Sequence, residues 1–127
     1  MKTASTIARY LLGTVFLVFG LNGFLQFIHM PPPTGTAAEF MGALFVSHYL
    51  VVVFLLQLVP ALLLLADRYV PLALVLLGPV IVNILLFHAF MAPNGLPLAL
   101  AAAILWALAF AGVRSAFSGI FQQRVTA

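Results

Sequence analysis

Six uncharged or titratable polar side chains lie within otherwise apolar stretches of the chain, and they are its most chemically capable residues. Amide and imidazole groups donate and accept hydrogen bonds, and imidazole also ligates metals and haem. No nucleophile–base pair, phosphate-binding loop or nucleotide fingerprint accompanies them, which favours a protein that binds rather than an enzyme. The predicted ligand-binding residues are Asn22, Gln26, His48, Asn83 and His88, the sixth polar residue is Gln57, and His29 and Glu39 lie just outside the apolar stretches.

These residues are compatible with few ligands. Histidines together with Glu39 could bind a divalent metal, but no His-x-x-x-His spacing is present, so we predict no metal site. Two histidines on separate helices could ligate haem, again without a motif. Hydrogen bonding to the carbonyl oxygens of a quinone, or to a lipid headgroup, requires only donors beside an apolar cleft and no particular motif. The alternative for Asn22, Gln26 and Asn83 is a structural one, namely interhelical hydrogen bonds worth about 0.6 kcal/mol each.

The composition places these residues in a membrane. Of 127 residues, 65% are hydrophobic and only 6% are charged, whereas roughly a quarter of a soluble domain is charged. The basic residues are scattered singly, without the clustered patch that nucleic-acid binding requires. The chain has no cysteine, which excludes thiol chemistry by this chain.

The apolar stretches predict an all-α integral membrane four-helix bundle with up-down-up-down topology, formed by residues 1–127 as a single transmembrane domain. The expected spans, the first of them uncleaved, are about 8–28, 40–66, 71–91 and 96–117. Proline residues and polar turns separate them, notably Pro31–Pro33, Asp67-Arg68 and Pro93-Asn94-Gly95.

The distribution of basic residues predicts the orientation. All Lys and Arg residues flank one side of the four spans, whereas the segment 29–39 and the turn 93–95 on the other side contain none. Because cytoplasmic loops are enriched in Lys and Arg, both termini are expected to be cytoplasmic. The basic residues are Lys2, Arg9, Arg68, Arg114 and Arg124.

The predicted depth of the polar residues points to a pocket in the outer half of the bilayer. Asn22, Gln26 and His29 share one helix face, and His48 and His88 lie at similar depth. Asn83 is about 140° from His88 around a regular helix, so the two share a cavity only if it is wide. His48 and Gln57 are nine positions apart, which in one continuous helix turns Gln57 to the opposite side. Gln57 is therefore expected to face a partner subunit or a different helix pair.

Small residues recur in the first and fourth spans at helical spacings. Such residues let membrane helices approach closely, so they are predicted to pack helices and to have no chemical role. They are Gly13, Gly20, Gly23, Ala99, Ala103, Ala107 and Ala111.

Four segments together resemble the DoxX-like family of small bacterial four-helix membrane proteins. They are ARYLLGTVFLVFGLNGF, FMGALFVSHYL, PVIVNILLFHAF and GLPLAL, and the resemblance extends from about Arg9 to Phe117. It implies a multi-pass protein of the bacterial inner membrane. The family includes the membrane subunit of a thiosulfate:quinone oxidoreductase and proteins linked to redox-stress complexes. Asn22, Asn83 and His88 fall in its recurrent polar segments.

Two functions are expected from these observations. The first is a non-catalytic accessory subunit or partner in a larger, respiratory or redox-linked membrane complex, or in a homo-oligomer. The alternative is a quinone-interacting redox subunit that uses the outer polar pocket, with quinone favoured over haem as cofactor. The sequence leaves open the ligand, the partner proteins, the oligomeric state and the physiological role.

Overall fold

The computed structural model describes residues 2–126, which form helices and contain no β-strand. The helices are α1 (Lys2–Leu25), α2 (Gly35–Val46), α3 (Tyr49–Ala66), α4 (Val70–Phe90) and α5 (Leu96–Val113), with the short 3₁₀ helices η1 (Pro93–Gly95) and η2 (Arg114–Phe117) flanking α5. Four of these helical segments are long and apolar enough to cross a membrane, namely α1, α3, α4 and the segment from η1 to η2. The chain is thus an all-helical protein of multi-pass type.

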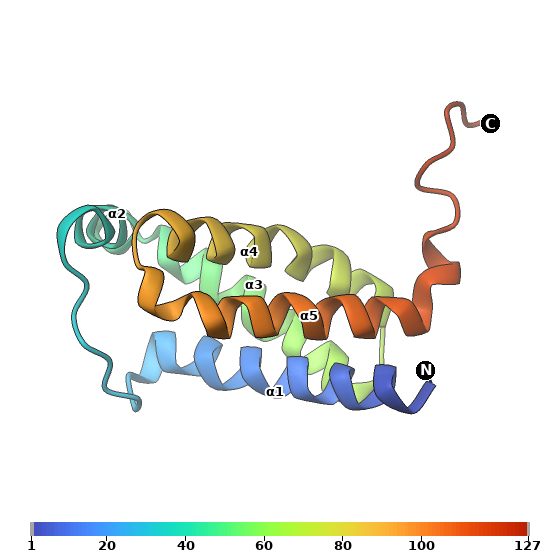
Figure 1. Cartoon of the computed structure of the whole chain (residues 1–127). Coiled ribbons are helices and arrows are strands. Elements are labelled where there is room, and N and C mark those ends of the chain that lie inside the picture. The colour runs from blue at the N-terminus through green and yellow to red at the C-terminus, as the bar shows by residue number, and fades with distance from the viewer. Residues whose placement is uncertain (1, 127) are drawn as a thin grey trace.

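The four long helices lie side by side and alternate in direction (Figure 1). α1 and α4 each pack mainly against both α3 and α5. Both ends of the chain and the α3–α4 turn lie at one end of the bundle, which we call the terminal end (Figure 1). The α2 helix and the α4–α5 turn lie at the opposite end, which we call the α2 end.

The single helix expected over residues 40–66 is instead two helices. The chain breaks at His48, whose φ of 64° and ψ of 10° place it in the left-handed region, where the helical hydrogen-bond ladder cannot continue. α2 therefore lies across the end of the bundle, so that Figure 1 looks nearly along its axis. Its 12 residues extend about 18 Å, too short for a hydrocarbon core of about 30 Å.

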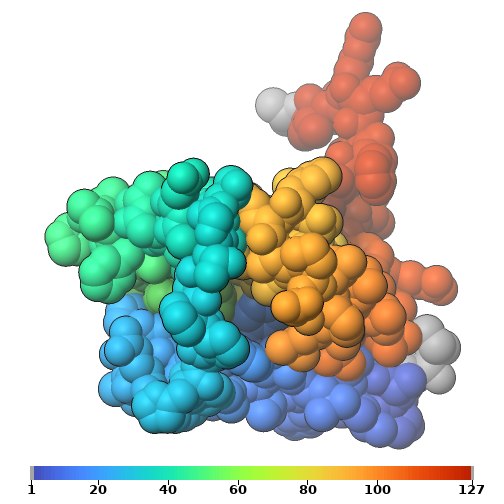
Figure 2. Space-filling view, turned by 60° about the vertical axis from the view of Figure 1, so that its left-hand side comes forward, coloured from blue at the N-terminus to red at the C-terminus, as the bar shows by residue number. Residues whose placement is uncertain are grey.

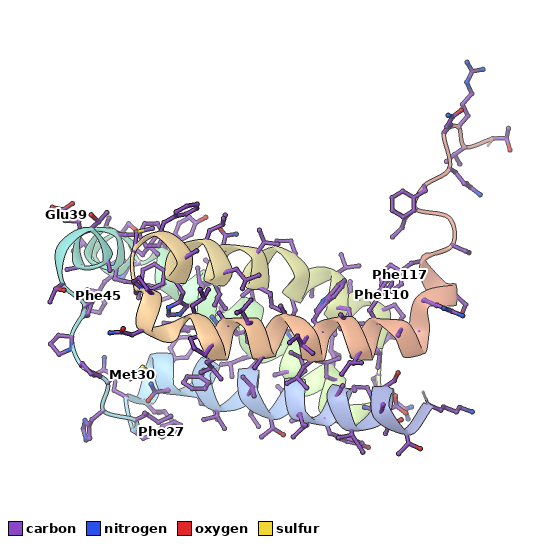
Figure 3. All side chains as sticks on the ribbon, viewed as in Figure 1. Phe27, Met30, Glu39, Phe45, Phe110 and Phe117 are labelled. Carbon is purple, nitrogen blue, oxygen red and sulfur yellow. The ribbon has the colours of Figure 1, made fainter. Side chains whose placement is uncertain are left out.

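The closely packed core lies toward the terminal end. The side chains of Leu12, Leu64, Leu74 and Leu77 have no exposed surface, and Trp106 Nε1 donates a hydrogen bond of 2.9 Å to the Leu74 carbonyl. This bond ties α5 to α4. Phe110, labelled in Figure 3, stacks on Trp106 with ring centroids 5.3 Å apart and also contacts Phe117 at 4.8 Å.

The glycines of α1 lie against α3. A Cβ atom on Gly13 would lie 2.9 Å from Leu65 Cγ, and one on Gly20 would lie 2.9 Å from Leu58 Cγ. A Cβ on Gly23 would overlap the ring of Phe54. Only glycine allows α1 to approach α3 this closely.

The four alanines of α5 that were predicted to pack helices do not form one continuous buried stripe. Ala99 is buried, but Ala107 is exposed and Ala103 and Ala111 are half-buried. Four residues advance a helix by about 400°, so a strict four-residue series drifts around the axis. The buried alanines of α5 are instead Ala99, Ala102 and Ala109.

Candidate functional site

A large cavity lies at the α2 end between the long helices. It has a volume of about 1000 Å³ and is lined by residues of all five α-helices and of the 26–30 segment. Figure 2, which brings this end forward, shows a hollow between the chain segment leading into α2 and the start of α5. The cavity is in the size range of sites that hold drug-sized and larger apolar ligands.

Aromatic side chains and the displaced α2 helix border this space. Phe16, Phe19, Phe54 and Phe87 form much of its wall. Phe87 also holds α2 over the end of the bundle, because its ring lies 5.7 Å from that of Phe40. The walls are thus mainly hydrocarbon.

Four of the five predicted ligand-binding residues come together around this cavity. Asn22 and Gln26 reach it from the end of α1, His48 from the α2–α3 joint, and His88 from the end of α4. His29 also lines it. The structure thus brings these hydrogen-bonding groups to one apolar space, while their binding role stays a prediction.

Asn83 lies away from the cavity, contrary to the expected pocket. Its side chain is exposed on the outer face of α4, and its Nδ2 donates a 2.8 Å hydrogen bond to the Pro79 carbonyl one turn earlier. The reason is the angle of about 140° that five residues subtend on a helix. The wall of α4 turned toward the cavity is formed by Ile84, Phe87 and His88 instead.

Gln57 lies inside the molecule, contrary to the expected partner interface. Only 7% of its surface is exposed, and it lines the same cavity as His48. The expectation failed because the break at His48 interrupts the helical angle between the two residues. Among residues 2–126 its side-chain amide has no hydrogen-bond partner, so its donor and acceptor atoms are available to a molecule in the cavity.

Gln57 marks the deep part of the cavity. It lies eight residues after the start of α3 at Tyr49, or about 12 Å along the helix axis. Gln26, His29 and His48 are exposed at the α2 end and form the mouth. The cavity therefore has polar groups at its mouth, apolar walls along its length and a polar amide in its deep part.

Two of the lining groups have local structural roles as well. Asn22 Oδ1 accepts a 2.7 Å hydrogen bond from the Ile28 N–H, which fixes the chain leaving α1. His88 Nδ1 lies 3.0 Å from the Ala92 carbonyl oxygen. Because a carbonyl only accepts, Nδ1 is the donor in this hydrogen bond, and Nε2 is the ring nitrogen left for another partner. Gly95 packs on this ring so closely that any Cβ there would overlap it.

The cavity has the chemistry of a binding site for an uncharged polar head. In the described part of the chain, no group of three His, Cys, Asp or Glu side chains could hold a metal ion. Glu39 does not line the cavity; it is exposed on the outer side of α2 (Figure 3). The cavity therefore offers amides and imidazoles as hydrogen-bonding groups within hydrocarbon walls.

One polar cluster at the terminal end was not identified from the sequence. Arg9, interpreted there only as an orientation signal, is 9% exposed; it donates to the Leu64 carbonyl and lies 3.7 Å from Asp67 Oδ1. Ser5, one turn earlier, is buried, and its hydroxyl has no hydrogen-bond partner among residues 2–126. The available signal was that apolar residues both precede and follow Arg9, as expected for a buried arginine.

No protein-family model, curated protein or solved structure matches the chain.

Proposed function

We propose that this membrane protein binds a lipophilic molecule with an uncharged hydrogen-bonding head, of the quinone class, in the cavity at the α2 end. The observation that carries the proposal is Gln57, which is 7% exposed and lines an apolar cavity of about 1000 Å³. Within residues 2–126 no side chain or carbonyl pairs with its amide, whose atoms are open to the cavity. Its NH₂ group can therefore donate to a ligand carbonyl.

The shape and lining of the cavity support this ligand class. Phe16, Phe19 and Phe54 present ring surfaces to a planar head, and aromatic pairs add about 0.5–1.5 kcal/mol beyond the area that they bury. The mouth residues Gln26 and His48 lie about 12 Å from Gln57 along the axis of α3, too far to bond the same ring, so the head is assigned to Gln57 alone. The surrounding aliphatic walls suit an isoprenoid or acyl tail.

A role as an accessory subunit of a larger respiratory or redox-linked complex is a second candidate, compatible with the first. Asn83 favours it, because its side chain is exposed on the outer face of a helix that is apolar enough to span the membrane. Polar side chains at such positions bind neighbouring helices in preference to lipid. The partner contact is thus proposed for the outer face of α4, in place of Gln57.

The orientation and family are part of the same proposal: both termini cytoplasmic, in a bacterial inner membrane, within the DoxX-like family. The terminal end carries Lys2, Arg9, Arg68 and Arg114, which supports this orientation. The chain has no cysteine, so single cysteines report topology directly. An impermeant maleimide added to intact cells should label Thr34→Cys and spare Ser118→Cys, and the reverse pattern would invert the proposed orientation.

The ligand proposal is tested by extracting the protein in mild detergent and quantifying co-purified lipophilic molecules by mass spectrometry. Gln57→Leu keeps the side-chain size and removes the amide, and we expect about tenfold less bound ligand, corresponding to one hydrogen bond made at a desolvated site. Gln122→Leu, in the exposed C-terminal segment, should retain the full amount. Equal retention by all three proteins, or no bound lipophile in any, would refute the proposed site.

A further inference from the structure

The α2 helix stands at the mouth of the ligand cavity. Its residues Met41, Phe45 and Val46 line the cavity, and in Figure 2 the segment leading into α2 crosses the near face of the molecule. Gln57 lies about 12 Å along the axis of α3 from the start of that helix. A molecule that moves from this end of the bundle to Gln57 therefore passes α2.

The attachment of α2 to the long helices is weak. Of its 12 residues only Ala37 is buried. Among residues 2–126, α2 makes no hydrogen bond and no ion pair to α1, α3, α4 or α5. Its main aromatic contact with another helix is that of Phe40 with Phe87 of α4, whose rings lie 5.7 Å apart. An element with so few buried contacts can open locally at a low cost in free energy.

A residue in the left-handed region lies at each end of α2. His48, which separates α2 from α3, has a φ of 64°, and Gly35, the first residue of α2, has a φ of 60°. His48 is exposed, and a Cβ on Gly35 would have no atom within 4 Å, so packing does not enclose either joint. Residues at the ends of elements are the usual hinges of moving segments, because they absorb the change in backbone angles.

We propose that α2 is a lid, which rotates about His48 and Gly35 to admit the ligand and closes through the contact of Phe40 with Phe87. The sides of α2 fit this role, because Phe45 lines the cavity while Glu39 is exposed on the outer side. The inference assumes, as the proposed function does, that the cavity admits a small apolar molecule. It does not assume that this molecule is a quinone, and its test uses none.

The test measures how fast a thiol inside the cavity reacts with an apolar reagent. The chain has no cysteine, so Ala102→Cys places a single thiol at a cavity-lining position that is 6% exposed. The full-length protein in mild detergent is treated with pyrene maleimide, a bulky reagent that becomes fluorescent on reaction. At low reagent concentration the labelling rate follows the open fraction. Adding Phe40→Ala should raise this rate about fivefold, because losing one aromatic contact shifts the opening equilibrium by about that factor.

Matched variants separate a lid from general loosening of the bundle. Phe40→Tyr keeps the ring and should label at the parent rate. Phe90→Ala, which removes a 79% exposed ring at the same end of the bundle, should also leave the rate unchanged. If Ala102→Cys does not fold, Ala99→Cys offers a second cavity-lining position for the same measurement.

Three outcomes would overturn the lid: an unchanged rate in Phe40→Ala, an equal rise in Phe90→Ala, or no labelling of the cavity thiol in any variant. Ligand retention by Gln57→Leu tests the proposed function separately. A failure of the lid and a failure of the ligand site are therefore distinguishable.

Discussion

The two halves of the bundle are built from similar apolar residues but packed in opposite ways. In the terminal half, leucines such as Leu12, Leu64 and Leu74 are completely enclosed. In the α2 half, phenylalanines surround a cavity of about 1000 Å³. Hydrophobicity alone therefore does not distinguish a packed core from a binding cavity. The residue shapes, and the point at which a helix is broken, make that difference.

The polar residues of the two halves also differ, because the protein supplies partners for one of them and not for the other. Arg9 in the terminal half is held by the Leu64 carbonyl and lies near Asp67, so it links α1 to the α3–α4 turn. Gln57, at the floor of the cavity, has no such partner within residues 2–126. A polar group with partners stabilises the fold, whereas a buried polar group without one is suited to a ligand.

The largest effect is expected from removing a leucine in the packed half. Leu74→Ala should lower the free energy of unfolding by about 2 kcal/mol or more, because van der Waals contacts are lost around a new void. Leu98→Ala, which borders the existing cavity and is 50% exposed, should cost less than about 1 kcal/mol. Reversible unfolding in mixed micelles measures both, and equal losses would show that the two halves are packed alike.

Glycine substitutions should differ in sign between contact and open positions. In Gly13→Ala the new Cβ would lie 2.9 Å from Leu65 Cγ and 3.3 Å from the Ala61 carbonyl oxygen, so we expect a loss of about 1–3 kcal/mol. In Gly78→Ala the nearest atom is 3.9 Å away, and the gain in helix propensity should stabilise by about 0.5–1 kcal/mol. The same unfolding assay decides, and a stabilising Gly13→Ala would refute the close α1–α3 contact.

A smaller effect is expected at the joint that separates α2 from α3. His48 has a φ of 64°, a conformation that β-branched residues strongly disfavour. His48→Val should therefore cost about 1–2 kcal/mol, while His48→Asn should stay within about 0.5 kcal/mol because asparagine tolerates this region. Thermal unfolding measures both variants. Equal stability of the two would contradict the left-handed conformation at His48 that separates α2 from α3.

Much of the helical framework could be predicted, because four long apolar stretches separated by proline and polar turns leave few alternatives. The break at His48 could not. Its neighbours Val46 and Tyr49 continue the apolar pattern, and neither glycine nor proline marks the left-handed residue. Arg9 was interpreted from its position alone, and only the contacts of its guanidinium show that it is buried.

The candidate site could be predicted wherever the helices are regular and unbroken, because side-chain directions then follow from sequence spacing. The groups at the ends of helices, such as Asn22 and His88, reach one cavity because consecutive antiparallel helices bring those ends together. Asn83 points elsewhere, as its angle to His88 had indicated. Gln57 was misplaced because its position relative to His48 was calculated for one continuous helix, which the structure interrupts.

The central claim is that the α2 half is hollow in order to hold a ligand, whereas the terminal half is packed for stability. Titration calorimetry with a short-tailed quinone on two matched variants tests it most directly. Ala99→Leu, which adds volume beside the cavity, should weaken binding at least about tenfold and change stability by less than about 1 kcal/mol. Ala73→Leu, in the fully enclosed core, should leave affinity unchanged and cost about 1–3 kcal/mol. Unchanged quinone affinity in Ala99→Leu, or no binding by the unmodified protein, would contradict the account.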